Sequence, residues 1–142
     1  MFLGEFTHTL DEKSRITIPA KYRAELLAGL VMTTGFDRCI LLFSQQEFER
    51  LSEKMNSLQF IGREQNALRR RFYSDASDAI PDKQGRIILP EYLRNYASIT
   101  SEIVIAGVGR YIELWNGEAW DKVCAEMQEL AAQQDLWAKL GI

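Results

Sequence analysis

The sequence has little of the chemistry on which enzymes and metal sites commonly depend. Its 142 residues include one histidine, two cysteines and three prolines. Cys39 and Cys124 form no CxxC pair, and no histidine, cysteine and acid cluster has the spacing of metal ligands. We therefore expect no metal, no other cofactor and no disulfide. The two cysteines are predicted to be buried structural thiols in a reducing compartment.

Long apolar stretches are also missing. No stretch approaches the roughly 18 apolar residues of a membrane span. Residues 1–5 lack the charged region and the apolar run of a secretory signal. These features predict a cytoplasmic protein with no membrane partner.

A basic excess is absent as well. There are 17 lysines and arginines against 20 acids, which gives a formal net charge of −3. A nucleic-acid-binding domain is usually expected to be basic. Local distribution matters more than the sum, however, and the acids are concentrated in residues 113–142. The charge therefore leaves DNA binding open.

Catalytic motifs are not visible. His8, the single histidine, has no nucleophile partner and is predicted to lie half-buried in a strand, on one face with Phe6 and Leu10. Residues 107–109 (GVG) lack the third glycine and the following helix of a dinucleotide loop, so they predict a hairpin turn. We expect neither an enzyme nor a small-molecule substrate.

What the sequence does contain is a motif that occurs twice. Residues 11–23 (DEKSRITIPAKYR) align without a gap to residues 82–94 (DKQGRIILPEYLR), at an offset of 71. The likeness continues as far as the region around Trp120, at an offset of 72. We therefore predict one compact domain over residues 1–142, built from two intertwined repeats of about 1–73 and about 74–142, the second ending in a helix.

Each motif copy predicts a turn, a short strand and a short helix. Asp11 and Asp82 open the turns, because an aspartate can accept hydrogen bonds from backbone N–H groups two residues on. Gly85 suits a turn position with positive φ, where the first copy has Ser14. Apolar residues two apart follow, and a proline then ends the strand and begins a helix.

The rest of the chain predicts an α+β fold that is mainly β. Ser44 and Glu47 have the spacing of a helix capping box, and Asn116 is placed to cap the last helix. In the first of the helices that follow these caps, Phe48, Leu51 and Met55 are predicted to face inward. Strands are expected at residues 2–10, 31–34, 39–43, 74–80, 102–106 and 111–115, and helices at about 20–28, 45–57, 62–73, 90–97 and 118–133.

Together these residues resemble a known family. Residues 1–5 (MFLGE), the two Asp-x-x-x-Arg motifs, residues 18–23 (IPAKYR) and residues 112–115 (IELW) are similar to MraZ, the bacterial transcriptional regulators of the division and cell-wall gene cluster. The resemblance implies an AbrB-like swapped-hairpin β-barrel, formed by two tandem pseudo-symmetric repeats with peripheral helices. It also implies a ring-shaped, octamer-like homo-oligomer. This ring would bind short promoter repeats in double-stranded DNA at the nucleoid, as a repressor.

The resemblance also assigns roles to individual residues. It implies that Arg15, Lys13 and Arg86 contact DNA, and Lys83 is added because of its charge. Arg suits this role because its planar fork can bind a phosphate or a guanine edge. The first motif copy is expected to contribute more to DNA binding than the second. Further candidates are the turn-supporting residues Asp11, Asp82 and Gly85, and the secondary DNA contacts Lys21, Arg23 and Arg94.

Each assignment has a structural alternative. Asp and Arg four apart can simply close an ion pair across the turn, although Asp can also hold the turn while Arg points outward. The lysines can be ordinary surface residues. Arg23 and Arg94 can pair with acids and fix a helix to the barrel. The arginines at residues 69–71 (RRR) can lie near a helix C-terminus, where the helix dipole favours positive charge.

Two further interpretations remain open. Trp115, Trp120 and Trp137 are expected in the core or at a subunit contact rather than as platforms for bases. For the whole protein, the rival function is a ring-shaped protein-interaction module that binds DNA only incidentally.

Overall fold

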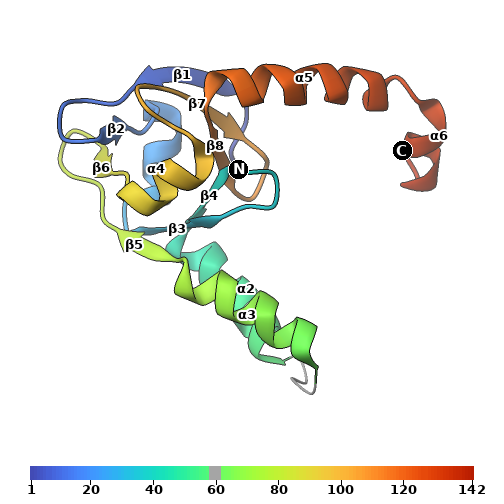
Figure 1. Cartoon of the computed structure of the whole chain (residues 1–142), viewed down its shortest axis with the longest axis horizontal. Helices are drawn as coiled ribbons and strands as arrows, with labels where there is room; N and C mark the ends of the chain where they lie inside the picture. The colour runs from blue at the N-terminus through green and yellow to red at the C-terminus, as the bar shows by residue number, and fades with distance from the viewer. Residues whose placement is uncertain (58–61) are drawn as a thin grey trace.

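Two antiparallel sheets form the body of the chain in the computed structural model, which describes residues 1–57 and 62–142. The larger sheet has the strand order β1-β7-β8-β4-β3-β5, and β2 and β6 form a separate two-stranded ribbon (Figure 1). The strands are β1 (Glu5–Thr9), β2 (Arg15–Thr17), β3 (Leu30–Thr34), β4 (Ile40–Ser44), β5 (Ser77–Ala79), β6 (Arg86–Ile88), β7 (Glu102–Gly107) and β8 (Ile112–Trp115).

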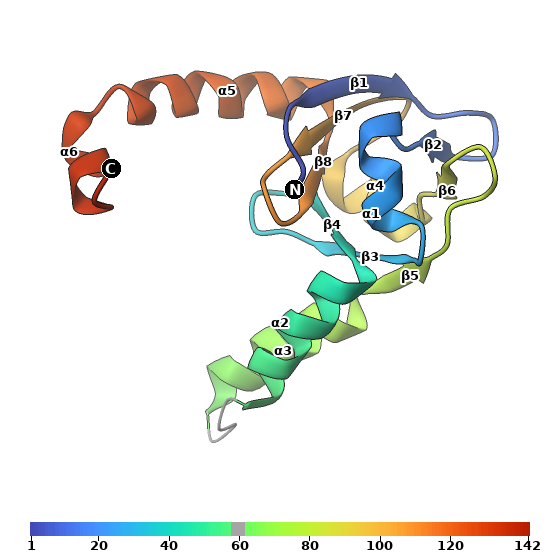
Figure 2. The same ribbon diagram turned by 180° about the vertical axis from the view of Figure 1, so that it is seen from behind.

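The helices fall into two groups. Short helices after each ribbon strand pack onto the body, and longer ones form two arms that project from it (Figures 1 and 2). The short ones are the 3₁₀ turn η1 (Ala20–Tyr22) with α1 (Arg23–Leu26), and α4 (Glu91–Ala97). One arm contains α2 (Gln45–Ser57) and α3 (Arg63–Ser74), and the other contains α5 (Gly117–Ala131) and α6 (Gln134–Lys139).

The two repeats are related by a pseudo-twofold axis. In the ribbon, Ile16 pairs with Ile87, its own counterpart in the repeat. In the large sheet, Leu41 pairs with Glu113, which are counterparts too. Each pair must lie on the axis, because it joins equivalent positions. The prediction of an α+β fold with two tandem repeats is confirmed.

The first strand of each repeat is exchanged. Strand β1 pairs with β7 of the second repeat, and β5 pairs with β3 of the first. The large sheet is nevertheless not closed into a barrel, since β1 and β5 form its two edges and the ribbon is a separate sheet. The barrel implied by the family resemblance is therefore an open sheet with a ribbon beside it.

Both repeats contribute to one core. Its buried side chains include equivalent residues of the two motif copies, such as Ile16 with Ile87 and Ile18 with Leu89. Tyr22, at the position of Leu93, is also buried, and its hydroxyl donates a 2.6 Å hydrogen bond to the Leu3 carbonyl. Neither repeat could bury these side chains alone, so the ribbon strands are fixed in register by the shared core.

The arms depart most from the sequence predictions. Phe48, Leu51 and Met55 were expected to face inward, but α2 has no fully buried residue. The helix leaves the body and packs with α3 (Figure 2), so these side chains are only half-buried. Helix α6 was not predicted. The expected capping box is half formed, because the Glu47 N–H donates to Ser44 Oγ while the Glu47 carboxylate pairs with Arg50.

The cysteines and tryptophans differ in burial. Cys39 is buried as predicted, but Cys124 lies on the projecting helix α5 and is only half-buried, which contradicts its prediction. Trp115 is in the core and Trp120 is half-buried, whereas Trp137 on α6 is 42% exposed. Trp137 is therefore outside the core of this chain.

Candidate nucleic-acid interface

The β2–β6 ribbon brings the two motif copies together. Its inner face consists of Ile16 and Ile87, which are buried. Because side chains alternate along a strand, the outer face carries the neighbouring positions. In the antiparallel register Arg15 lies opposite Ile88, and Thr17 lies opposite Arg86. We call Arg15, Thr17, Arg86 and Ile88 the ribbon face.

The turn before β2 is held by the Asp11 carboxylate. One oxygen, Oδ1, accepts hydrogen bonds from the N–H groups of Lys13 and Arg15, both at 2.9 Å. The other, Oδ2, accepts from Arg15 Nε at 2.7 Å. The N–H of Ser14 donates to the Asp11 carbonyl at 3.0 Å, which closes the turn. A single aspartate thus fixes both the turn and the arginine.

The second turn repeats this geometry. Asp82 Oδ1 accepts from the N–H groups of Gln84 and Arg86 at 2.9 and 2.8 Å, and Oδ2 accepts from Arg86 Nε at 2.8 Å. The Gly85 N–H closes the turn on the Asp82 carbonyl at 2.9 Å. The predicted ion pair across each turn is therefore present, and its geometry is the same in both repeats.

These hydrogen bonds change the acidity of both aspartates. The backbone N–H of Arg15 is the largest cause that lowers the pKa of Asp11 below its ordinary value of 3.8. The N–H of Arg86 does the same for the pKa of Asp82. Both carboxylates are thus charged at neutral pH, and each remains paired with its arginine.

The turns require unusual backbone geometry. Ser14 and Gly85 have φ values of 57° and 76°, in the left-handed region. Each turn also bonds to the other repeat, since the Ile18 N–H donates to the Gly85 carbonyl at 2.8 Å and the Leu89 N–H to the Ser14 carbonyl at 2.9 Å. The two turns consequently form one unit, side by side at one end of the molecule (Figures 1 and 2).

The two arginines converge on one surface. Asp11 and Asp82 engage only the Nε atoms, so within residues 1–57 and 62–142 the terminal nitrogens of Arg15 and Arg86 have no hydrogen-bond partner. Both side chains line the same hollow of about 450 Å³ between β5 and β6. The arrangement presents two oriented guanidinium groups that can bind an anionic or hydrogen-bonding ligand.

The lysines of the turns are exposed. Lys13 contributes only its backbone N–H to the hydrogen bonds described for the first turn, and both Lys13 and Lys83 lie on the surface. Glu12 in the first turn corresponds to Lys83 in the second. The first turn therefore has two acids and two bases, and the second has one acid and two bases.

The helix arginines have a structural role. Arg23 Nε donates to the Ile18 carbonyl and Arg94 Nε to the Leu89 carbonyl, both at 3.0 Å. Each bond joins a short helix to the end of a ribbon strand. The predicted acid partners are therefore replaced by backbone carbonyls. Lys21 is exposed, with its Nζ 6.0 Å from the centre of the Phe6 ring.

The run of arginines on α3 also makes internal contacts. Arg71 Nε donates to Thr34 Oγ1 at 3.1 Å, and its guanidinium lies 5.1 Å from the centre of the Tyr96 ring. Arg69 donates to Asn56 Oδ1 at 3.0 Å. Arg71 is also 3.9 Å from Asp75. Residues 69–71 are thus tied in part to the helical arm and the sheet.

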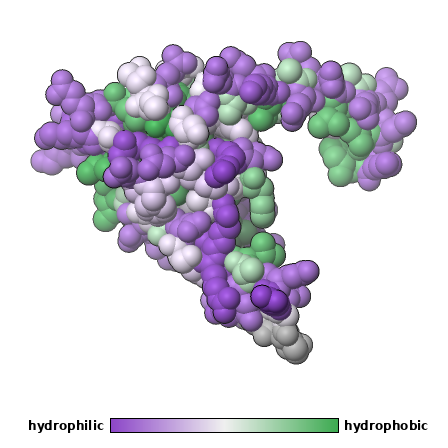
Figure 3. All heavy atoms as spheres, viewed as in Figure 1, coloured by the Kyte–Doolittle hydropathy of each residue, from purple (hydrophilic) through white to green (hydrophobic). Residues whose placement is uncertain are grey.

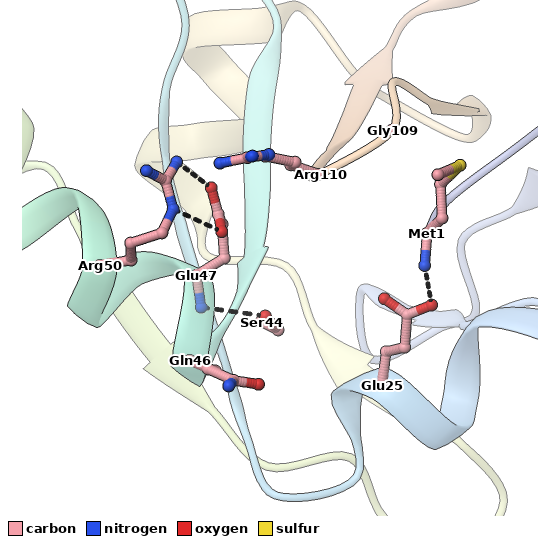
Figure 4. A pocket seen from close by; sticks show the side chains of 8 residues that line it. All are labelled: Met1, Glu25, Ser44, Gln46, Glu47, Arg50, Gly109 and Arg110. Carbon is pink, nitrogen blue, oxygen red and sulfur yellow. Dashed lines mark hydrogen bonds and ion pairs between the residues drawn. The ribbon is translucent and has the colours of Figure 1, made fainter.

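A second polar hollow, of about 480 Å³, lies near the N-terminus (Figure 4). Arg50 and Glu47 form an ion pair there, and Arg110 points toward the same carboxylate. The hydrogen bond from Arg50 is the main cause that lowers the pKa of Glu47. The Glu47 carboxylate is thus paired with Arg50, and the hollow has no arrangement typical of catalysis.

Other site classes find no counterpart in the described residues. Within residues 1–57 and 62–142, no group of three or more His, Cys, Asp or Glu side chains could hold a metal ion. In the same ranges, no helix combines the length and apolar character needed to cross a bilayer. His8 is half-buried on β1, on one face with Phe6, as predicted.

Two members of the ribbon face were missed by the sequence analysis. Thr17 and Ile88 were assigned only to strands, but they lie between the two arginines on the outer surface. The alternation Arg-Ile-Thr in β2 could have identified Thr17. Residues 86–89 (RIIL) show no alternation, so Ile88 could be found only from the pairing with β2.

Comparison with known proteins agrees with this architecture. The family model described as "MraZ protein, putative antitoxin-like" matches twice, over residues 1–71 and 72–138. Several bacterial proteins named Transcriptional regulator MraZ are similar to the chain. The one from Micrococcus luteus is 45% identical over 95% of this chain and 94% of the relative. The relative from Carboxydothermus hydrogenoformans is 40% identical, over 99% of this chain and 96% of the relative. The relative from Herpetosiphon aurantiacus is 47% identical, over 87% of this chain and 86% of the relative.

These relatives bear a regulator's name rather than an enzyme's. Two matches to the family model cover nearly the whole sequence, and the relatives align over most of both chains. The doubled Asp-x-x-x-Arg turn, the exchanged strands and these matches lead to the same conclusion, which is that the chain belongs to the MraZ family.

Proposed function

We propose that this chain is a sequence-specific DNA-binding transcriptional regulator whose ribbon face contacts the DNA. One observation carries the proposal: Arg15 and Arg86 come from different repeats, yet line one hollow, and the turn aspartates accept hydrogen bonds from their Nε atoms. Each is oriented by an aspartate, and an oriented guanidinium can read a guanine edge bidentately. The printed name of the relatives supports the same function.

The surrounding residues fit supporting roles. Lys13 and Lys83 would contact phosphates, which position a protein without reading sequence. Asp11, Asp82 and Gly85 would support the turns. Lys21, Arg23 and Arg94 would contribute at most secondary contacts, because the two arginines are already engaged with carbonyl groups.

An acidic chain with so small a cationic surface would bind DNA weakly as a single copy. We propose that it assembles into a ring, octamer-like in size, which sets several ribbon faces side by side. Binding to repeated promoter boxes would then raise avidity by about 10²–10⁴ without new contacts. The proposed targets lie upstream of the division and cell-wall genes, where the ring would act as a repressor at the nucleoid.

The arm formed by α5 and α6 is the surface that we propose for such assembly. Trp137 on α6 and Leu140, the residue after this helix, are exposed, Leu140 at 72%. Figure 3 shows hydrophobic residues, in green, gathered on the inner side of this arm, while hydrophilic residues cover its outer side. Exposed apolar patches of this kind are typical of protein contacts, and a second copy is the proposed partner.

The test is a gel-shift measurement with DNA from upstream of the chain's own gene. The Arg15→Ala variant should lose specific binding while its oligomeric state stays that of the wild type. Lys54→Ala, at an exposed position of α2 away from the ribbon face and from α6, is the matched control and should bind normally. Unchanged affinity of the Arg15 variant would overturn the proposal.

A salt titration separates this function from the rival one, a protein-interaction ring. Contacts with several phosphates make log K fall linearly with log salt, by about 0.9 per contact. A flat response, or equal affinity for scrambled DNA, would favour the protein-interaction module.

A further inference from the structure

The ribbon face is not symmetric, although the backbone beneath it is. Ile88 and Thr17 occupy equivalent positions of β6 and β2. One is an apolar side chain and the other carries a hydroxyl group. Ile88 is 62% exposed and lies opposite Arg15, whereas Thr17 is half-buried and lies opposite Arg86. The two arginines therefore have different neighbours.

An exposed isoleucine is not unusual by itself. Ile88 differs because it lines the same hollow as Arg15 and Arg86. Figure 3 shows apolar atoms among hydrophilic ones at the end of the molecule that carries β6. An apolar group between two cations fits a ligand that offers both hydrogen-bond acceptors and a methyl group.

We propose that Ile88 contacts the methyl group of a thymine in the major groove and so determines part of the DNA sequence that is bound. The inference rests on the function proposed above and extends it. Thymine is the one base with a methyl group in that groove, where guanine offers two acceptors to arginine. Because Thr17, its counterpart in the other strand, is half-buried, we expect this contact from Ile88 alone.

The dimensions of the ribbon fit such a contact. A two-stranded ribbon can enter the major groove. Two residues along a strand span about 6.6 Å, close to two base-pair steps of about 3.4 Å. Arg15 and Arg86 are diagonal neighbours, about 7–8 Å apart. The thymine should therefore lie within about two base pairs of a guanine that contributes to the binding affinity only when Arg15 is present.

The first experiment uses the wild-type protein and a duplex that contains its preferred box. Each thymine is replaced in turn by deoxyuridine, which removes only the methyl group. Replacement of the thymine next to Ile88 should weaken binding about three- to fivefold, as expected for loss of one buried methyl group. If no thymine in the box responds, the inference is wrong.

The second experiment repeats this measurement with Ile88→Ser. This variant should bind the thymine and deoxyuridine duplexes equally. Val108→Ser, at an exposed valine in the β7–β8 hairpin, is the matched control and should keep the wild-type difference. If Ile88→Ser does not fold, as judged by its thermal transition, Ile88→Gln replaces it, because glutamine is polar and carries no methyl group. It should at least halve the methyl effect.

The outcomes distinguish the inference from the function on which it rests. If the Ile88 variant shows the same difference between the thymine and deoxyuridine duplexes as the wild type, the proposed role of Ile88 is wrong. If Arg15→Ala still abolishes specific binding in that case, the proposed function stands. Equal binding of wild type to the box and to scrambled DNA would overturn both.

Discussion

The Arg23 side chain of the first repeat lies directly against Gly85 of the second, so that a Cβ atom at position 85 would come within 2.5 Å of Arg23 Nε. Arg23 is held there by its bond to the Ile18 carbonyl. The second turn, its glycine and a helix of the other repeat are thus packed as one unit. A side chain at position 85 would therefore displace Arg23 from its present place, besides adopting a positive φ.

Gly85→Ala should therefore lower the free energy of unfolding by more than the cost of placing alanine at a positive φ. Gly109→Ala is the matched control, because Gly109 has a φ of 77° and nothing within 4 Å of an added Cβ. We expect a loss of about 1 kcal/mol for the control and about 2–3 kcal/mol for Gly85→Ala. Urea denaturation measures both. Equal losses would show that the contact with Arg23 has no energetic role.

The turn carboxylates predict a pH dependence of stability. The pKa values of Asp11 and Asp82 are lowered in the folded chain from 3.8. The folded state therefore binds fewer protons, and their contribution is present above about pH 4 and lost as pH falls through the folded values. The melting temperature of wild type should exceed that of the Asp11→Asn, Asp82→Asn double variant at neutral pH. This gap should shrink below about pH 4. A gap that is constant or widens in acid would contradict the assignment.

The helix arginines should affect stability rather than DNA binding. Arg94→Met removes the bond to the Leu89 carbonyl, and Arg23→Met removes the bond to the Ile18 carbonyl. Each loss should cost about 1.5–3 kcal/mol. The salt dependence of DNA binding should stay that of wild type. A shallower salt slope with unchanged stability would instead identify these residues as phosphate contacts.

The turn lysines should behave in the opposite way. Lys13→Ala and Lys83→Ala should weaken binding to all sequences alike and reduce the salt slope by about 0.9 each. Stability should hardly change, because both side chains are exposed. Lys54→Ala on α2 serves as the control. A change in sequence preference without a change in slope would mean that a lysine reads bases.

Much of this architecture could be predicted from the sequence, because the motif is local. The Asp11 turn is specified by residues within five positions of one another, and the same holds for Asp82. The outward position of Ile88 depends instead on pairing with β2, some 70 residues away. The projecting arms could not be predicted either, because the helical pattern of α2 identifies its apolar side but not the element that packs against it.

Arg15 is central to the proposed function, so footprinting on the DNA upstream of the chain's own gene is the decisive test. The wild-type protein should protect short repeated boxes, spaced so that one oligomer can bind several. Arg15→Ala should leave these boxes unprotected at the same concentration while forming the same oligomer. Protection of identical boxes by the variant would contradict the central role given to the ribbon face.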